Sequence, residues 1–215
     1  MTFDHSKKEL DFTKDDRTMS EVASYVMNLT KNLIKQSSTR EALNEKGYPE
    51  NGPIEQTIRA YQSKGSSVYE QALDAMQTGC GNCQEMAYTG ALLLRLGGYQ
   101  GPVKIGIFGL NHMFLILDDY IIDTWAGKHY PFKRWRENLV GYGGAIRDGV
   151  MMGKVFPANH FELEDEIPEV TQEVGTLSDC LPSLNSQKEL RGIVHSHFIR
   201  LDKQKKEAPT HTHKP

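Results

Sequence analysis

Three residues in the middle of the chain carry the side chains that nucleophilic acyl transfer requires, and the first of them is Cys83. It follows a glycine-containing turn at residues 77–82 and precedes an apolar run, residues 86–96, which has helix-forming side chains, no proline and a Gly97-Gly98 stop. A cysteine at the start of such a helix faces unpaired backbone N–H groups and the positive end of the helix dipole, and both favour a thiolate. Cys83 is therefore the candidate nucleophile.

A base and an orienting carboxylate follow in one predicted hairpin. Two β-type apolar runs, residues 112–117 and 120–125, flank an Asp-Asp turn, which is typical of two antiparallel strands. Residues that face each other across such a turn have numbers that add up to about 237, so Asp123 lies on the diagonal from His112, within reach of a hydrogen bond. The spacing predicts a Cys83–His112–Asp123 triad, in which the histidine takes the thiol proton and the aspartate orients the imidazole.

These residues resemble a known superfamily. Residues 77–83, Gln-Thr-Gly-Cys-Gly-Asn-Cys, resemble the nucleophile segment of papain-like cysteine proteases, and residues 111–112 and 123–127 are similar to the histidine strand and the Asn-Ser-Trp-Gly segment of the same fold. Residues 81–87 also resemble the Gly-x-Cys-x-[Asp/Glu]-x-Ala pattern of the transglutaminase-like branch. That branch likewise uses aspartate as its third member and keeps cysteine and histidine a few dozen residues apart, whereas papain proteases separate them further and use asparagine. The resemblance covers residues 77–127.

The resemblance implies a fold and two further roles. The fold is an α+β, papain/transglutaminase-like core, with the nucleophile at the N-terminus of a central helix packed on an antiparallel sheet. Gln77, six residues before Cys83, is expected to donate its side-chain amide to the oxyanion, beside the backbone N–H of Cys83. Trp125 is expected to shield the histidine–aspartate hydrogen bond from water. His129 is a rival base, disfavoured because it lies past the hairpin.

The expected activity is cysteine-dependent acyl transfer on the amide bonds of a protein or peptide substrate. Water after attack on a peptide bond gives proteolysis, water after attack on a glutamine side chain gives deamidation, and an amine there gives transglutamination. The same triad serves all three reactions, so the sequence leaves them open. A small enzyme with this core also resembles secreted bacterial effectors, which implies a host-cell protein as an alternative target. No metal or organic cofactor is expected.

Cys80 and Cys83 also form a CxxC motif, which two other classes of protein use. A thioredoxin-like redox centre has a strand with an aromatic residue before the first cysteine, whereas a helical stretch precedes Cys80. A structural zinc site needs four ligands, and no second CxxC lies nearby; His211 and His213 have metal-like spacing, but only in the tail. With only Cys180 far along the chain, Cys80 is expected to stay a free thiol. A thiol–disulfide redox protein remains the alternative function, together with a catalytically silent binding module of the same fold.

Composition excludes several kinds of partner. The 215 residues contain 25 Lys and Arg against 28 Asp and Glu, a formal net charge of −3, without a dense basic stripe, so nucleic acid and membrane surfaces are not expected partners. Three cysteines, an odd number, argue for a reducing compartment. The first residues lack the apolar core of a signal peptide, and no run approaches about 18 apolar residues. We therefore expect a cytoplasmic protein without membrane insertion, with transfer into a host cell as the effector alternative.

The rest of the sequence predicts one catalytic domain over residues 18–206, between a flexible N-terminus at 1–17 and a disordered tail at 207–215. Capping boxes and helical periodicity predict a helical lobe over residues 18–76, ahead of a catalytic core at 77–160.

Local patterns also predict the individual elements. The predicted helices span residues 19–36, 38–46, 53–64, 67–76, 83–96, 132–140 and 186–206. A strand is predicted at residues 102–108, ahead of the hairpin, and another at 150–156. The glycine-rich residues 141–144 predict a surface loop, with a lid over the cleft as the alternative, and the acidic residues 162–169 predict a solvated loop or a docking surface for a basic partner.

Overall fold

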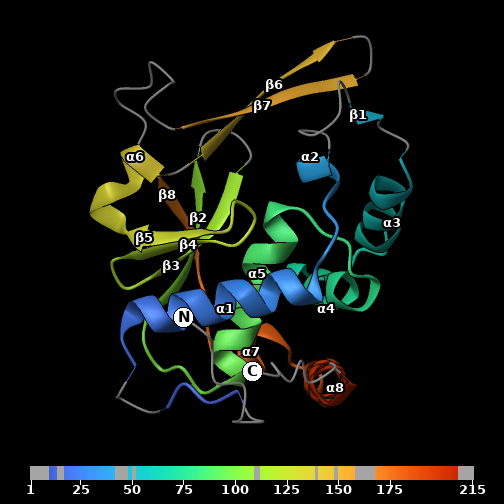
Figure 1. Ribbon diagram of the computed structural model, residues 1–215, viewed down its shortest axis with the longest axis vertical. Helices are drawn as coiled ribbons and strands as arrows, with labels where there is room; N and C mark the ends of the chain where they lie inside the picture. The colour runs from blue at the N-terminus through green and yellow to red at the C-terminus, as the bar shows by residue number, and fades with distance from the viewer. Residues whose placement is uncertain are drawn as a thin grey trace, which may run out of the picture.

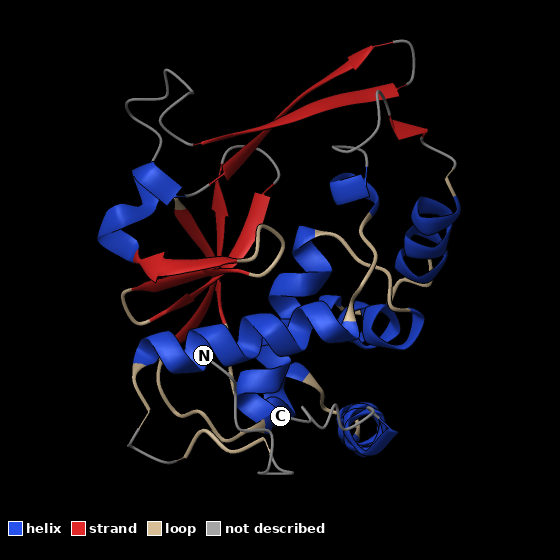
Figure 2. Cartoon of the chain, in the orientation of Figure 1, coloured by secondary structure: helices blue, strands red, loops and turns tan. Residues whose placement is uncertain are grey.

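The computed structural model describes residues 10–13, 17–41, 48–49, 52–108, 112–138, 140–147, 150–157 and 168–207. These residues form an α+β structure, in which helices pack against a five-stranded antiparallel sheet and a smaller three-stranded sheet lies above it in the view of Figures 1 and 2. The predicted α+β class is therefore confirmed. In the described part of the chain, no helix is long and apolar enough to cross a membrane.

The main sheet has the strand order β5-β4-β3-β2-β8, and all neighbouring strands are antiparallel. Its strands are β2 (Val103–Phe108), β3 (His112–Leu117), β4 (Tyr120–Asp123), β5 (Lys128–Pro131) and β8 (Glu169–Glu173). The hairpin of β3 and β4 turns at residues 118–119 and places Leu115 opposite Ile122, which confirms the predicted register. Asp118 takes a positive φ of 49°, as tight hairpin turns require.

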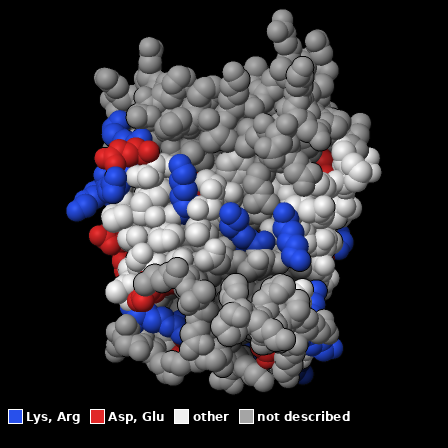
Figure 3. Space-filling model, in the orientation of Figure 1, with Lys and Arg blue, Asp and Glu red and all other residues white. Residues whose placement is uncertain are grey.

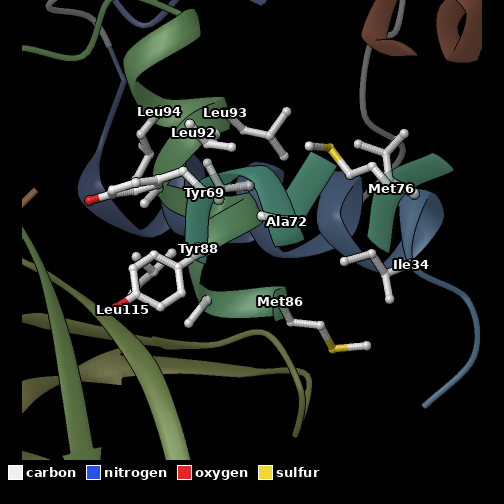
Figure 4. Close-up of a cluster of buried hydrophobic side chains, with 14 of the residues drawn as sticks. Ile34, Tyr69, Ala72, Met76, Met86, Tyr88, Leu92, Leu93, Leu94 and Leu115 are labelled. Carbon is white, nitrogen blue, oxygen red and sulfur yellow. The ribbon is translucent and has the colours of Figure 1, made fainter. Parts of the chain in front are cut away.

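Helices α1 (Met19–Leu33), α4 (Val68–Thr78) and α5 (Cys83–Leu96) form most of the core with the sheet. The other helices are α2 (Ser38–Glu41), α3 (Pro53–Gln62), α7 (Leu177–Cys180) and α8 (Leu184–Glu207). Figure 4 shows side chains of α4 and α5 packed together, among them Tyr69, Ala72, Leu92 and Leu93. The predicted capping box at the start of α1 is confirmed, and a further capping box, at Ser67, opens α4.

Helix α5 is buried along most of its length because it lies among α1, α4 and the sheet. All of its residues from 85 to 94 are buried. The closest approach is at Gly90, where a Cβ would lie 2.4 Å from Cδ1 of Leu115 on β3 and 3.3 Å from Cγ1 of Val26 on α1. Because only glycine allows the helix to come so near, the predicted packing of this helix on the sheet is confirmed.

Strand β3 is buried on both faces, since its side chains alternate between two apolar clusters. Leu115 and Leu117 belong to the main core, which includes residues of α1, α4 and α5. Phe114 and Ile116 pack in a second cluster with Trp135. A strand covered on both sides reads as a continuous apolar run, which is the pattern that residues 112–117 show.

Several elements differ from the sequence prediction. Pro131 ends β5 and does not open a helix, so the helix predicted at 132–140 is reduced to the 3-10 turn η1 (Phe132–Arg134) and α6 (Trp135–Asn138). The predicted core ended at residue 160, yet β8 beyond it forms the edge of the main sheet beside β2. Within the segment predicted to be a flexible N-terminus, Phe12 is buried and its N–H donates to the carbonyl of Gly97 at 2.7 Å.

The prediction of a loop or lid at residues 141–144 is wrong. These glycines lie in β6 (Val140–Arg147), which pairs antiparallel with β7 (Val150–Pro157), and β1 (Tyr48–Pro49) completes this smaller sheet. Glycine weakens a strand by itself, but the cross-strand hydrogen bonds to β7 are backbone bonds that need no side chain. The strand predicted at 150–156 is confirmed as part of β7.

Two other predictions lie outside the described residues: the acidic segment at 162–167, and the tail with His211 and His213. On the face drawn in Figure 3, the Lys and Arg side chains of the described residues are scattered, and some of them lie beside Asp or Glu side chains. That dispersed arrangement agrees with the small formal net charge of −3.

Candidate active site

The candidate nucleophile is held by the chain that precedes it. Helix α4 ends at Gly79, whose φ of 73° is the left-handed conformation that closes many helices. The carbonyl of Gly79 accepts the N–H groups of Lys35 and Gln36, both at 3.0 Å. Gly81 in turn donates its N–H to the carbonyl of Gln36 at 2.9 Å. The segment after α1 thus anchors the α4–α5 turn, and Cys83 follows as the first residue of α5.

His112 and Asp123 form a buried pair. Nε2 of His112 lies 2.7 Å from Oδ2 of Asp123, and the two side chains are 3% and 0% exposed. The other carboxylate oxygen of Asp123 accepts the N–H of Ala126 at 2.9 Å, which fixes the plane of the carboxylate. The structure therefore brings together the two side chains that the hairpin register predicts to meet.

The imidazole also meets the candidate nucleophile. A hydrogen bond and an electrostatic interaction join the Cys83 side chain to His112, whose Nε2 is bonded to Asp123. Burial lowers the pKa of His112, but the charge of Asp123, the hydrogen bond to it and the interaction with Cys83 outweigh burial and raise this pKa well above its usual 6.5. His112 can therefore hold a proton beside the Cys83 side chain.

The residue before the nucleophile, Asn82, is the N-cap of α5 and ties this helix to the segment between α1 and α2. Its Oδ1 accepts from Oγ of Ser37 at 2.9 Å and lies 3.0 Å from Oγ of Ser38. The same oxygen accepts from the backbone N–H of Thr39 at 3.2 Å and from its Oγ1 at 3.1 Å. The backbone N–H of Asn82 donates to the buried carboxylate of Glu85 at 2.9 Å. The N-terminus of α5 is thus fixed from two directions.

Trp125 lies against the imidazole. Its ring meets the His112 ring edge-on, with centroids 5.4 Å apart and planes at 65°. The indole Nε1–H is shared between Oγ of Ser37 at 3.2 Å and Oγ1 of Thr39 at 3.0 Å. The buried ring lies where the predicted shielding of the histidine would require it.

Gln77 does not join this cluster, which corrects the predicted oxyanion role of its amide. The residue lies on an exposed part of α4, and its Nε2 donates to Oε1 of Glu189 on α8. The sequence suggested a turn at residue 77, whereas α4 continues to Thr78 and carries the amide toward α8.

The rival base also has another partner. Nδ1 of His129 lies 3.4 Å from Oη of Tyr120, and the two rings are 5.8 Å apart. Burial lowers the pKa of His129. The structure therefore pairs His112, and not His129, with the candidate nucleophile.

The two cysteines of the CxxC motif have different surroundings. Cys80 is buried, and its Sγ donates to Oε1 of Gln36 at 3.4 Å, whereas Cys83 meets His112. No disulfide joins Cys80, Cys83 or Cys180. Over the described residues, no group of three or more His, Cys, Asp or Glu side chains is arranged to hold a metal ion.

The sequence prediction missed Asn82 and the hydroxyl residues that bind it. The spacing of Asn82 and Glu85 is that of a helix cap followed by an acidic residue, so a local signal for Asn82 existed. Ser37 lies 45 residues before Asn82, and no pattern in the sequence connects the two. Only the folded chain shows that these residues belong to one site.

Comparison with known proteins does not place the chain in a family. No family model matches it, and no curated protein matches it either. The geometry of Cys83, His112 and Asp123 therefore carries the functional argument by itself.

Proposed function

We propose that this protein is a cysteine-dependent acyl-transfer enzyme that acts on the amide bonds of a protein or peptide through Cys83, His112 and Asp123. The observation that carries the proposal is the buried imidazole of His112, which is hydrogen-bonded both to the carboxylate of Asp123 and to the side chain of Cys83. A histidine that only stabilised the core would be satisfied by the carboxylate and would not need a cysteine at the start of a helix. A histidine between the two groups is the arrangement that activates a cysteine nucleophile.

The proposal includes a papain/transglutaminase-like core. Its support is the placement of the nucleophile at the amino end of a buried helix, with the base and the carboxylate on neighbouring strands of an antiparallel sheet. Of the residues that carry the sequence resemblance, Cys83, His112, Asp123 and Trp125 lie in one cluster. Gln77 does not, so this part of the resemblance is left out of the proposal.

The first half of the reaction follows from these positions. The Cys83 thiolate attacks the carbonyl carbon of the amide, and the C–S bond forms while the carbonyl oxygen takes the negative charge. Backbone N–H groups of the first turn of α5 bind this oxyanion. The His112 imidazolium gives its proton to the leaving nitrogen, the C–N bond breaks, and a thioester on Cys83 remains with a free amine or ammonia.

The second half decides the product. His112, now neutral, takes a proton from water or from an amine, which attacks the thioester and displaces the Cys83 thiolate. Water yields a carboxylic acid, and an amine yields a new amide. Protease, glutamine deamidase and transglutaminase activities differ only in which amide enters and which nucleophile follows, and all three use the same His112 and Asp123.

The test of this proposal is the rate at which iodoacetamide alkylates each cysteine, measured by mass spectrometry from pH 5 to 9. We expect Cys83 to react well below about pH 8.5, where a free cysteine thiol ionises. His112→Ala removes the cation and should slow the reaction at pH 6 by about 10²-fold, in the range of general acid–base effects. The same cysteine in the urea-unfolded chain is the reference, and buried Cys80 is the internal control.

If Cys83 in the folded protein follows the pH dependence of the unfolded chain, the nucleophile assignment is wrong. If Cys80 and Cys83 react alike, or are found in one disulfide, the redox alternative replaces the proposal. Three parallel assays with casein then distinguish the substrate class. New N-termini indicate proteolysis, released ammonia without amine incorporation indicates deamidation, and incorporation of a fluorescent primary amine indicates transglutamination. Cys83→Ala should abolish whichever signal appears without lowering the melting temperature by more than a few degrees.

A further inference from the structure

Two hydroxyl groups, that of buried Ser37 and that of half-buried Thr39, connect the helix of Cys83 to the ring that packs against His112. Oγ of Ser37 and Oγ1 of Thr39, named the hydroxyl pair below, each lie within hydrogen-bond distance of both Oδ1 of Asn82 and Nε1 of Trp125. The four distances run from 2.9 to 3.2 Å. The two hydroxyls are also 3.2 Å from each other.

The directions of these hydrogen bonds are consistent. The indole N–H of Trp125 can only donate, so the hydroxyl pair accepts from it and is free to donate its own protons. The backbone N–H of Thr39 also can only donate, and it lies 3.2 Å from the amide oxygen of Asn82, which therefore is the acceptor. The chain of donors thus runs from Trp125 through the hydroxyl pair to Asn82.

Each end of this chain touches one member of the proposed catalytic pair. Asn82 is the N-cap residue that directly precedes Cys83, so the position of its side chain sets the start of α5. Trp125 packs edge-on against His112 at 5.4 Å. Cys83 and His112 come from different elements, and the hydroxyl pair is a link between those elements that does not use the catalytic groups themselves.

Ser38 lies between the two hydroxyls in sequence but is bound differently. Its single hydroxyl proton can go to Oε2 of Glu55 at 2.8 Å or to Asn82 at 3.0 Å, and the carboxylate is the stronger acceptor. Ser38 therefore ties the segment to α3, whereas Ser37 and Thr39 are the residues that reach Trp125.

We propose that Ser37 and Thr39 are positioning residues, which hold the Cys83 thiol and the His112 imidazole in the geometry needed for proton transfer. The inference rests on the proposed function and adds to it a part of the chain 45 residues upstream of the nucleophile's cap. Loss of the hydroxyl pair leaves all three triad side chains in place. It removes two of the hydrogen bonds that hold the start of α5 and both acceptors of the indole N–H beside His112. A thiolate–imidazolium pair depends steeply on such geometry, so its formation should suffer more than the fold.

The experiment compares the pH profile of Cys83 alkylation in Ser37→Ala/Thr39→Val with that of the wild-type chain. We expect the rate at pH 6 to fall about tenfold while the rate at pH 9 changes little, so that the profile moves to higher pH by about one unit. Thr39→Ser, made in the wild-type chain, keeps the hydroxyl and should keep the profile. Trp125→Phe keeps a ring but removes the indole N–H, and it should move the profile in the same direction.

Ser67→Ala is the matched control, because it removes a capping hydroxyl at the start of α4 and destabilises the fold without touching the site. If the double variant and this control leave the pH profile equally unchanged, the hydroxyl pair is structural and the inference is overturned. Should the double variant not fold, the pH profiles of Cys83 alkylation in Thr39→Val and in Trp125→Phe are compared with the control instead. Profiles that stay unchanged overturn the inference. A wild-type Cys83 that is not activated by His112 contradicts the proposed function, whereas an activated Cys83 that is insensitive to these variants contradicts the inference alone.

Discussion

At the scale of single residues, the fully buried carboxylate of Asp123 is stabilised by a hydrogen bond to each of its two oxygens. One oxygen is bound to His112 and the other to the N–H of Ala126. Removing one partner of such a buried pair typically costs about 3–5 kcal/mol, because the remaining charge has no compensation. The same contacts outweigh the burial of His112 and raise its pKa. Asp123 thus controls both the position and the charge of the base.

Asp123→Asn should therefore change how stability depends on pH. In a Cys83→Ala background no thiol titrates together with the histidine. There Asp123 outweighs burial and raises the folded pKa of His112 above the unfolded value of about 6.5, so its contribution to stability is complete below pH 6.5 and is lost as the pH rises toward the folded pKa. This loss is about 1.4 kcal/mol per pH unit. With asparagine the charge is gone, burial lowers the pKa of His112, and the decline disappears.

Urea unfolding from pH 6 to 9 measures the effect. His112→Ala in the same Cys83→Ala background is the control, since it removes the titrating histidine while the other titrating groups stay the same. Subtracting its free energy of unfolding from that of the Cys83→Ala chain isolates the histidine. A difference that stays constant over this range would show that His112 is not held as an imidazolium.

The sequence could predict the histidine–aspartate pair because a tight turn and the two-residue repeat of a strand fix which residues meet. His112 and Asp123 are 11 positions apart in the sequence, and the geometry of a single hairpin determines the contact between them. It could not place Gln77, whose amide goes to Glu189, 112 residues further along the chain. Contacts between residues so far apart in the sequence depend on how the helices pack, and the spacing of residues in the sequence does not predict them.

At the scale of elements, α5 determines the site because it presents Cys83 at its first turn while its body fills the core. Its sequence is apolar on all sides, which fits a helix covered by α1, α4 and the sheet together. The position of the thiol is therefore only as well defined as the packing of α5 against β3. That packing is tightest at Gly90.

Gly90→Ala tests this contact. The new Cβ would lie 2.4 Å from Cδ1 of Leu115, which is fully buried, so we expect a loss of about 1–3 kcal/mol through overpacking. Gly192→Ala on α8 is the matched control: nothing lies within 4 Å of its Cβ, and the better helix propensity of alanine should stabilise the chain by about 1 kcal/mol. Denaturant midpoints measure both. Equal midpoints for the two variants would contradict the close approach of α5 to β3.

Elements with a local signal were predictable, and those defined by a distant partner were not. The caps and apolar periodicity of α1 and α4 fixed their starts within the sequence. Strand β6 was missed because its glycines become regular only when paired with β7. Strand β8 was missed because its exposed side chains give no apolar alternation, and it becomes a strand through pairing with β2.

At the scale of the whole molecule, the helical lobe and the catalytic core predicted as successive parts share one interior. Val26 and Leu29 of α1 lie in the same apolar cluster as Leu92 of α5 and Leu115 of β3. The segment that follows α1 also supplies Ser37 and Thr39 to the site. Neither part can lose its structure without exposing the other, so the described chain should unfold as one unit.

The two tryptophans allow this to be measured. Trp125 lies in the main core beside the site, and Trp135 lies in the second cluster on the other face of β3. Trp135→Phe leaves Trp125 as the only tryptophan, and Trp125→Phe leaves Trp135 as the only tryptophan. In each variant we expect the midpoint of urea unfolding by fluorescence to equal the midpoint by far-ultraviolet circular dichroism, even though the two variants differ in stability. Because each variant is compared only with itself, the loss of the Trp125 hydrogen bonds does not affect the result. A fluorescence midpoint for Trp135 well below that of circular dichroism would show that the second cluster opens alone, and that the catalytic face of the sheet can stay folded without it.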